Sequence, residues 1–232
     1  MKSLIAGYRA LVIGSTGSIG SACVSVLNAD EGCSGVSELS RQSEPALVLE
    51  DESSIARAAK SVSSAGPFHL IIDATGALTI DGQGPEKSLQ ALDADRLMRS
   101  FQVNTIGPAL VMKHFIPLLD GKQRSIYAKL SARVGSISDN KKGGWYGYRS
   151  AKAALNMMLQ TAAIETLRKK PASIFVALQP GTVVSGLTAP FVRQEDCLLP
   201  ETSARGMLDA MDALSVSEGA QFIDYAGLPI NW

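Results

Sequence analysis

Short apolar runs alternate along the chain with longer segments in which apolar residues recur every three or four positions. Runs of the first kind are typical of buried parallel strands, and segments of the second kind are typical of amphipathic helices. The apolar runs predict strands at residues 9–14, 35–40, 45–50, 68–73, 124–131, 172–181 and 220–227. The periodic segments predict helices at residues 19–27, 53–66, 97–119, 146–170 and 200–214.

The order of these elements predicts the fold. Strands and helices alternate almost strictly, which is typical of one doubly wound parallel sheet with helices on both faces. A serine cap and Gly66 should bound the helix at 53–66, and Pro200 should lie in the first turn of the last helix. No internal repeat or change of composition interrupts the pattern. The sequence therefore predicts a single α/β domain over residues 1–232.

Composition and charge exclude several classes of function. Of the 232 residues, 46% are hydrophobic, and 22 basic residues balance 22 acidic ones, so no net field attracts nucleic acid or an anionic membrane. No run reaches the roughly 18 apolar residues of a membrane-spanning helix. Cys23, Cys33 and Cys197 form no CxxC pair, and His69 and His114 add no metal-like cluster, so a zinc site is not expected. These features favour a reduced cytoplasmic enzyme.

Four segments rich in glycine or small polar residues follow predicted strands: GSTGSIG (14–20), DATG (73–76), LSARVGS (130–136) and QPGTVVSG (179–186). Open parallel sheets bind ligands outside the carboxyl ends of their strands. The glycines of the first segment would let a diphosphate approach the next helix, whose free N–H groups favour anions. They also suit a plain strand-to-helix turn, and no lysine follows them as in a P-loop. The shared placement of the four segments predicts a cofactor site.

The end of the second predicted strand indicates which cofactor. NAD sites usually carry an acidic residue there for the ribose hydroxyls, whereas this chain has Ser40 and Arg41. A hydroxyl and a guanidinium suit a 2′-phosphate. Glu38 lies one pleat back on the same face as Ser40. The segment favours NADP over NAD, with a plain surface role for Arg41 as the alternative.

Tyr148 and Lys152 are four residues apart in a predicted helix, so they lie on one helix face. Taken alone, the pair also suits an ordinary solvated face. Tyr146 is a second phenol nearby, but no lysine stands four residues after it. Tyr148 is therefore the better candidate for a phenol that an ammonium group assists.

Six motifs occur in one order along the chain: GSTGSIG, DATG, FQVNTIGP, LSARVGS, YRSAK and QPGTV. With this order and spacing the chain resembles the short-chain dehydrogenase/reductase family from residue 9 to its end. Residues 85–108, 135–157 and 222–232 are most similar to the C-factor and sniffer-type carbonyl reductase branch. The resemblance implies a Rossmann fold and an NADP-dependent oxidoreductase that acts on small or medium carbonyl compounds.

The resemblance also implies a role for each matching residue. Tyr148 would be the catalytic acid and base, Lys152 its activator and a ligand of the nicotinamide ribose, and Asn104 would hold a water that links Lys152 to solvent. The loop Pro180–Val183 would pack against the nicotinamide. The residues implied to bind the cofactor are Gly14, Ser15, Thr16, Ser18, Ile19, Ser40, Arg41, Ala74, Gly76, Tyr148, Lys152, Pro180, Gly181 and Val183.

The chemistry of carbonyl reduction agrees with these roles. The reaction needs a hydride on the carbonyl carbon and a proton on its oxygen. A tyrosine with a pKa of about 10 is a poor base at neutral pH, and an adjacent ammonium and a cationic nicotinamide would lower that pKa. Tyr148 would then give a proton during reduction and take one during oxidation.

Two departures from the family pattern bear on the site. Ser18 stands where the family has the central glycine of the first turn, although Gly17 beside it keeps the turn flexible. The position of the usual catalytic serine falls on Ala132, with Ser131 just before it and Ser136 as a third candidate. Adjacent strand residues face opposite sides, so Ser131 can substitute only where the strand end is twisted or bulged. Ser131 is our candidate for binding the substrate oxygen.

Residues 185–199 should form a lid over the substrate, because loops over a rigid scaffold commonly carry binding residues. Their mostly apolar composition favours a small or medium carbonyl substrate; a plain surface loop is the alternative. The helices at 97–119 and 146–170 carry apolar residues on more than one face. In the family such helices often form a homodimer interface, and they could equally be buried against the sheet.

Two functions other than an active reductase are also compatible with a Rossmann fold. The scaffold could bind NADP as a sensor or signalling protein with little turnover, which the displaced serine allows. Retention of Tyr148, Lys152 and Asn104 together argues against that alternative. A serine hydrolase is disfavoured, because the chain has no GxSxG motif and neither histidine lies in a segment near a strand-end serine.

Overall fold

The computed structural model describes the whole chain, residues 1–232, and contains one six-stranded sheet in the order β2-β1-β3-β4-β5-β6. All neighbouring strands are parallel, which confirms the predicted fold class. The strands are β1 (Tyr8–Ile13), β2 (Cys33–Leu39), β3 (Leu70–Asp73), β4 (Ser125–Leu130), β5 (Ser173–Gln179) and β6 (Gln221–Asp224). The helices are α1 (Ser18–Asn28), α2 (Glu52–Val62), α3 (Ala94–Phe101), α4 (Gly107–Phe115), α5 (Tyr146–Leu167) and α6 (Pro200–Ala213).

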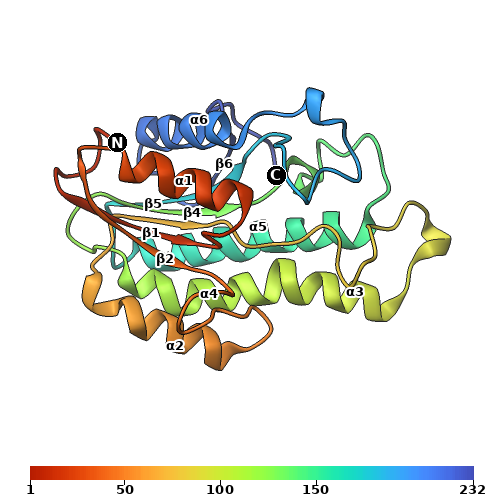
Figure 1. The fold of residues 1–232 in the computed structure, drawn as a ribbon, viewed down its shortest axis with the longest axis horizontal. Helices are drawn as coiled ribbons and strands as arrows, with labels where there is room; N and C mark the ends of the chain where they lie inside the picture. Colours follow the sequence, from red (N-terminus) through yellow and green to blue (C-terminus); the bar gives the residue numbers. More distant parts are fainter.

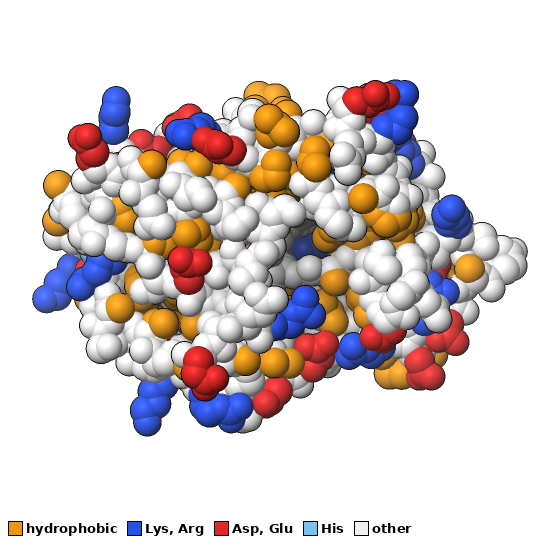
Figure 2. Space-filling view, viewed as in Figure 1, with side chains coloured by type: hydrophobic (Ala, Val, Ile, Leu, Met, Phe, Trp, Pro, Cys, Tyr) orange, Lys and Arg blue, Asp and Glu red, His pale blue; other side chains and the backbone are white.

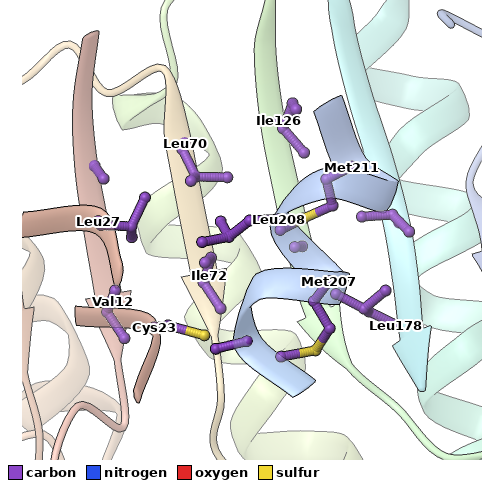
Figure 3. Packing of buried hydrophobic residues seen from close by; sticks show 14 of the residues in the cluster. Val12, Cys23, Leu27, Leu70, Ile72, Ile126, Leu178, Met207, Leu208 and Met211 are labelled. Carbon is purple, nitrogen blue, oxygen red and sulfur yellow. The ribbon is translucent and has the colours of Figure 1, made fainter. Parts of the chain in front are cut away.

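Helices cover both faces of the sheet (Figure 1), with α1 and α6 on one side and α2, α4 and α5 on the other. Side chains of β4 alternate between the two cores: Ala128 joins the cluster under α1 and α6, whereas Tyr127 joins the cluster under α5. Figure 3 shows the first cluster, where Met207 and Met211 of α6 lie against the sheet. The two cores hold the sheet between its helices. The carboxyl ends of the strands therefore form a rigid base for the site.

The strand predicted at residues 45–50 is wrong. These residues form no strand, and β2 is an outer strand of the sheet. β2 ends at Leu39, and a parallel neighbour needs a crossover of a dozen or more residues, whereas only residues 40–44 are available. Apolar residues of the segment are buried without strand pairing: Leu47 packs in the core under α2 and α4.

Two helix predictions differ from the structure at their ends or interior. The helix predicted at 53–66 begins at Glu52, and its cap is Asp51 rather than a serine, with the Asp51 carboxylate accepting from the N–H of Ser53. The helix predicted at 97–119 is divided by a π-helical turn, Gln102–Ile106, between α3 and α4. Pro108 follows this turn and has no N–H to donate to the carbonyl four residues back, which disfavours a regular helix there.

The last helix begins as expected, with Pro200 in its first turn. None of the helices combines the length and apolar composition needed to cross a lipid bilayer. The chain also contains no cluster of three His, Cys, Asp or Glu side chains that could hold a metal ion.

Candidate functional site

The four segments at the strand ends meet at one cleft of about 440 Å³. Figure 2 shows that this side of the molecule is hollowed near its centre, with hydrophobic side chains beside the hollow. The predicted site residues that line the cleft are Ser18, Ile19, Ala74, Gly76, Ser131, Tyr148, Lys152, Pro180, Gly181 and Val183. Gly14, Ser15, Thr16, Ser40, Arg41 and Asn104 do not line it.

The turn between β1 and α1 has the shape of an anion cradle. Gly14 has a positive φ of 83°, and its N–H donates to the carbonyl of Leu39 at 2.7 Å. A Cβ on Gly20 would overlap the carbonyl oxygen of Gly14, so the helix starts close against the turn. Gly17 is the N-cap of α1 and provides no side-chain cap, which leaves N–H groups for a ligand. These features fit the diphosphate of a dinucleotide.

Ser40 and Arg41 lie beside this turn, because the carbonyl of Leu39 also accepts from the N–H of Ser15. The Ser40 side chain is buried, and its hydroxyl accepts from the N–H of Gln42 at 3.0 Å. Arg41 is exposed and makes no ion pair with any carboxylate of the chain. Its guanidinium is therefore free to meet an anionic group near the turn.

Tyr148 and Lys152 lie together on the first turns of α5. The Lys152 ammonium is buried and donates to the carbonyl of Leu130 at 3.2 Å. Its Nζ lies 5.6 Å from the centre of the Tyr148 ring. Tyr148 is half-buried and lines the cleft, and its hydroxyl has no hydrogen-bond partner within the protein, so it can bond to a bound molecule.

Burial dominates the proton affinities of this pair. Burial raises the pKa of the Tyr148 phenol, which is opposite to the direction expected from the sequence. The Lys152 ammonium bonds to the carbonyl of Leu130 rather than to the phenol, so it does not offset the effect of burial. Burial lowers the pKa of Lys152 to about 7; the neighbouring Lys129 charge also lowers it, and Asp73 raises it. Lys152 can therefore change its charge near neutral pH.

Asn104 lies in the π-helical turn and is fully buried. Its Nδ2 donates to the carbonyl of Ala77 at 2.8 Å, and its Oδ1 accepts from the N–H of Ala77 at 3.0 Å. A Cβ on Gly76 would lie 3.1 Å from Asn104 Oδ1 and 3.3 Å from Lys152 Nζ. Asn104 and Lys152 thus flank Gly76, and the absence of a side chain there keeps them close.

The serine candidates point in different directions. The Ser131 hydroxyl donates to Oδ1 of Asn156 on α5 at 2.6 Å, although the residue lines the cleft. Ala132, in extended conformation, also lines the cleft and offers no hydrogen-bond donor from its side chain. Ser136 does not line the cleft, and its hydroxyl accepts from the N–H of Asp139.

An aromatic wall that the sequence did not indicate stands beside Tyr148. Trp145 packs edge-to-face on Tyr148, with ring centres 6.3 Å apart, and on Phe191, with ring centres 5.4 Å apart. Trp145 holds a left-handed backbone (φ 55°), which costs energy for a residue that is not glycine and is common at functional sites. Its N–H donates to the carbonyl of Glu86, and the Glu86 carboxylate accepts from the N–H of Gly147. The signal available in the sequence was a glycine pair before a bulky residue at a helix start.

A buried ion pair was also missed. Lys129 of β4 and Asp73 of β3 are fully buried, with Nζ and Oδ1 2.9 Å apart. The signals were a lysine inside the apolar run SIYAKL and an aspartate that ends LIID.

Comparisons with known proteins agree with this geometry. The family model described as short chain dehydrogenase matches residues 8–196. C-signal of Myxococcus xanthus is 32% identical over 169 residues, which are 72% of this chain and 94% of that protein. The 1-hydroxy-2-glutathionyl-2-methyl-3-butene dehydrogenase of Rhodococcus sp. strain AD45 is 30% identical over 82% of this chain and 80% of its own.

Solved structures share the fold at lower identity. An NADPH-bound carbonyl reductase from chicken fatty liver superimposes with a TM-score of 0.84 at 22% identity, over 98% of this chain and 95% of that one. The carbonyl reductase Sniffer of D. melanogaster does so with a TM-score of 0.78 at 18% identity, over 97% and 99% of the two chains.

Proposed function

Because the chain belongs to the short-chain dehydrogenase family, we propose that it is an NADP-dependent oxidoreductase that interconverts a small or medium carbonyl compound and its alcohol. The observation that carries the proposal is the meeting of Tyr148, Lys152 and a glycine turn at one cleft. Solved neighbours that contain NADP or NADPH support the choice of cofactor.

NADPH, when bound, supplies a hydride to the carbonyl carbon. Tyr148 would then donate its phenolic proton to the carbonyl oxygen, so that a C–H and an O–H bond form, the π bond of the carbonyl breaks, and the C–O single bond remains. Lys152 stabilises the resulting phenolate by its charge and holds the ribose of the cofactor. Asn104 keeps the Gly76 segment against Lys152 through its two bonds to Ala77. We expect Asn104 also to position a water that would resupply the proton.

We also propose that residues 185–199 act as a substrate lid. Leu187, Phe191 and Val192 line the cleft from this segment, whereas Arg193 pairs with Glu195 and Asp196 at its exposed tip. Apolar and aromatic side chains next to one reacting phenol suit a carbonyl with an apolar substituent.

The Arg41 guanidinium should bind the 2′-phosphate of NADP. Replacing Arg41 with alanine should reduce the preference for NADPH over NADH about tenfold or more, because a charge-assisted hydrogen bond is lost. Dissociation constants of both cofactors, measured by tryptophan fluorescence, would test this expectation. The matched control is Arg168→Ala, which removes another exposed guanidinium, just after α5. An unchanged preference in Arg41→Ala would contradict the role.

We propose Ser131 as the second donor to the substrate oxygen, reached by rotation of its hydroxyl away from Asn156. Ser131→Ala should lower kcat/KM for carbonyl reduction by at least about tenfold, because loss of a donor weakens transition-state stabilisation. Ala132→Ser is the companion variant, since Ala132 also lines the cleft. Full turnover in Ser131→Ala with increased turnover in Ala132→Ser would instead assign the donor position to residue 132.

The function as a whole is tested by NADPH consumption with a panel of aldehydes, ketones and dicarbonyl compounds. Turnover with any of them supports the reductase and ranks its substrates. NADPH binding without turnover on every compound would favour the alternative, an NADP-binding sensor on the same scaffold.

We further propose that the outer face of α5 joins a second copy of the chain. Met157, Met158 and Ile164 are exposed there, and a shallow groove runs between α4 and α5. Light scattering would distinguish a homodimer from a monomer of 24.4 kDa.

A further inference from the structure

The buried ion pair Asp73–Lys129 joins two neighbouring strands directly below the site. The two residues are register partners on β3 and β4, and both side chains have no exposed surface. Charges buried in this way are poorly screened by solvent and act over longer distances than surface charges. A pair with this placement therefore affects charged groups in the layer above it.

The pair also holds the turn that lines the cleft. Lys129 Nζ donates to the carbonyl and the hydroxyl oxygen of Thr75, at 2.8 and 3.0 Å. Asp73 Oδ1 accepts from the N–H and the hydroxyl of the same threonine, at 2.9 and 2.6 Å. Gly76, the next residue, is the one that lies against Lys152. The ion pair is thus one residue removed from the proposed catalytic lysine.

The pairing is incomplete on the acidic side. Oδ2 of Asp73 is buried without any hydrogen-bond partner, whereas the Lys129 ammonium is fully bonded. The Lys152 ammonium bonds to the carbonyl of Leu130, the residue that follows Lys129. Two ammonium groups therefore lie near one carboxylate in a buried space.

The other polar groups around Lys152 are not fully buried charges, so we expect them to affect its charge less than this pair does. Its own helix contributes Tyr148, the π-helical turn contributes the neutral Asn104, and Glu86 accepts from the first turn of α5. On the turn packed against α5, Arg133 directs its guanidinium to Asp224 of β6. Asp73 and Lys129 are the fully buried charges among them.

We propose that Asp73 and Lys129 are positioning residues that set the charge of Lys152, and thereby the pH range in which Tyr148 can transfer a proton. This inference rests on the proposed reductase function. Lys129 and Asp73 act on the pKa of Lys152 in opposite directions, and the effect of Lys129 is the larger. Loss of both charges should therefore raise the pKa of Lys152, and loss of the carboxylate alone should lower it.

The test compares Asp73→Asn, which leaves the buried Lys129 charge without its partner, with the double variant Asp73→Asn/Lys129→Met, which leaves no unpaired buried charge and so controls for the destabilisation of the single variant. The first readout is the pH at which kcat for NADPH-dependent reduction declines on the alkaline side, as Lys152 loses its proton. We expect a displacement of about one pH unit downward in Asp73→Asn, and a displacement upward by a fraction of a unit in the double variant, where the effects of the two lost charges partly cancel. Lys60→Met, an exposed lysine on α2, is the control and should leave the decline in place.

The second readout does not depend on turnover. Titration of ¹³C-labelled lysine side chains by NMR, with the Lys152 signal assigned by its absence in Lys152→Met, reports the proton affinity of Lys152 directly. Opposite displacements of this titration with no turnover on any carbonyl would reject the reductase and retain the charge coupling. Unchanged titration and an unchanged alkaline decline in both variants, even with lower kcat, would overturn the inference and leave the pair a purely structural role.

Discussion

Replacing Tyr148 with phenylalanine should lower kcat for carbonyl reduction by about 10²–10⁴-fold, while NADPH still binds. The phenol is the group in the cleft that combines a free hydroxyl with a lysine four residues away. Phenylalanine keeps the ring and its edge-to-face packing on Trp145, so the change removes only the transferable proton. Steady-state kinetics with the best substrate of the panel, together with NADPH binding measured by fluorescence, would check the expectation.

Tyr146→Phe is the matched control. Tyr146 lies two residues earlier on the same helix, is exposed and does not line the cleft. Its loss should change kcat less than about twofold, since surface substitutions away from special features have small effects. Equal losses in the two variants would contradict proton transfer by Tyr148, because they would point to a general disturbance of α5.

Replacing Gly20 with alanine should destabilise the fold by about 3 kcal/mol and abolish dinucleotide binding. The added methyl group would overlap the carbonyl oxygen of Gly14 and lie 3.1 Å from Cα of Ser15. These neighbours are backbone atoms, which cannot rotate away as a flexible side chain could. The turn itself is fixed by the bond from Gly14 to Leu39. Urea unfolding and NADPH titration would measure the two losses.

Gly35→Ala serves as the control for that experiment. Gly35 lies in β2, and a Cβ added there would meet no atom within 4 Å. We expect its free energy of unfolding to stay within about 0.5 kcal/mol of wild type. A Gly20→Ala protein as stable as Gly35→Ala would show that the first turn has room to move and would weaken its assignment as a tight diphosphate cradle.

Local pattern was sufficient to predict most of the fold. The predicted strands include all six observed ones. Burial on both faces leaves an almost uninterrupted apolar signature in β1, β3, β4, β5 and β6, whereas β2 is an outer strand that is buried only at Leu39. The same signature misled at residues 45–50, where apolar side chains are buried without pairing. The connection from Leu39 is too short for these residues to form a neighbouring parallel strand. This limit comes from the topology of the sheet and cannot be seen in the apolar pattern of the segment.

In the site, too, contacts within one segment could be predicted from the sequence, whereas contacts between distant segments could not. Spacing within one helix was enough to bring Tyr148 next to Lys152, because four residues make about one helical turn. The Asp73–Lys129 pair depends on the register between two strands whose residues are far apart in the chain, so pattern within one segment could not predict it. Trp145 and Phe191 meet only through the fold of the 185–199 segment. The direction of the Ser131 hydroxyl likewise depends on Asn156 of another element.

Because residues 45–50 form no strand, β2 and β6 are the two edge strands of the sheet, and their outer sides are covered to different extents. Beyond β6 the chain folds back, and the N–H of Ile230 donates to the carbonyl of Phe222, so that margin is sealed by its own C-terminal segment. β2 has no such cover, and its exposed residues Ser34 and Gly35 are poor formers of intermolecular strands. Parallel sheets assemble slowly and expose unpaired margins while they form. We therefore expect the small residues of β2 to make this edge a poor template for pairing with another chain.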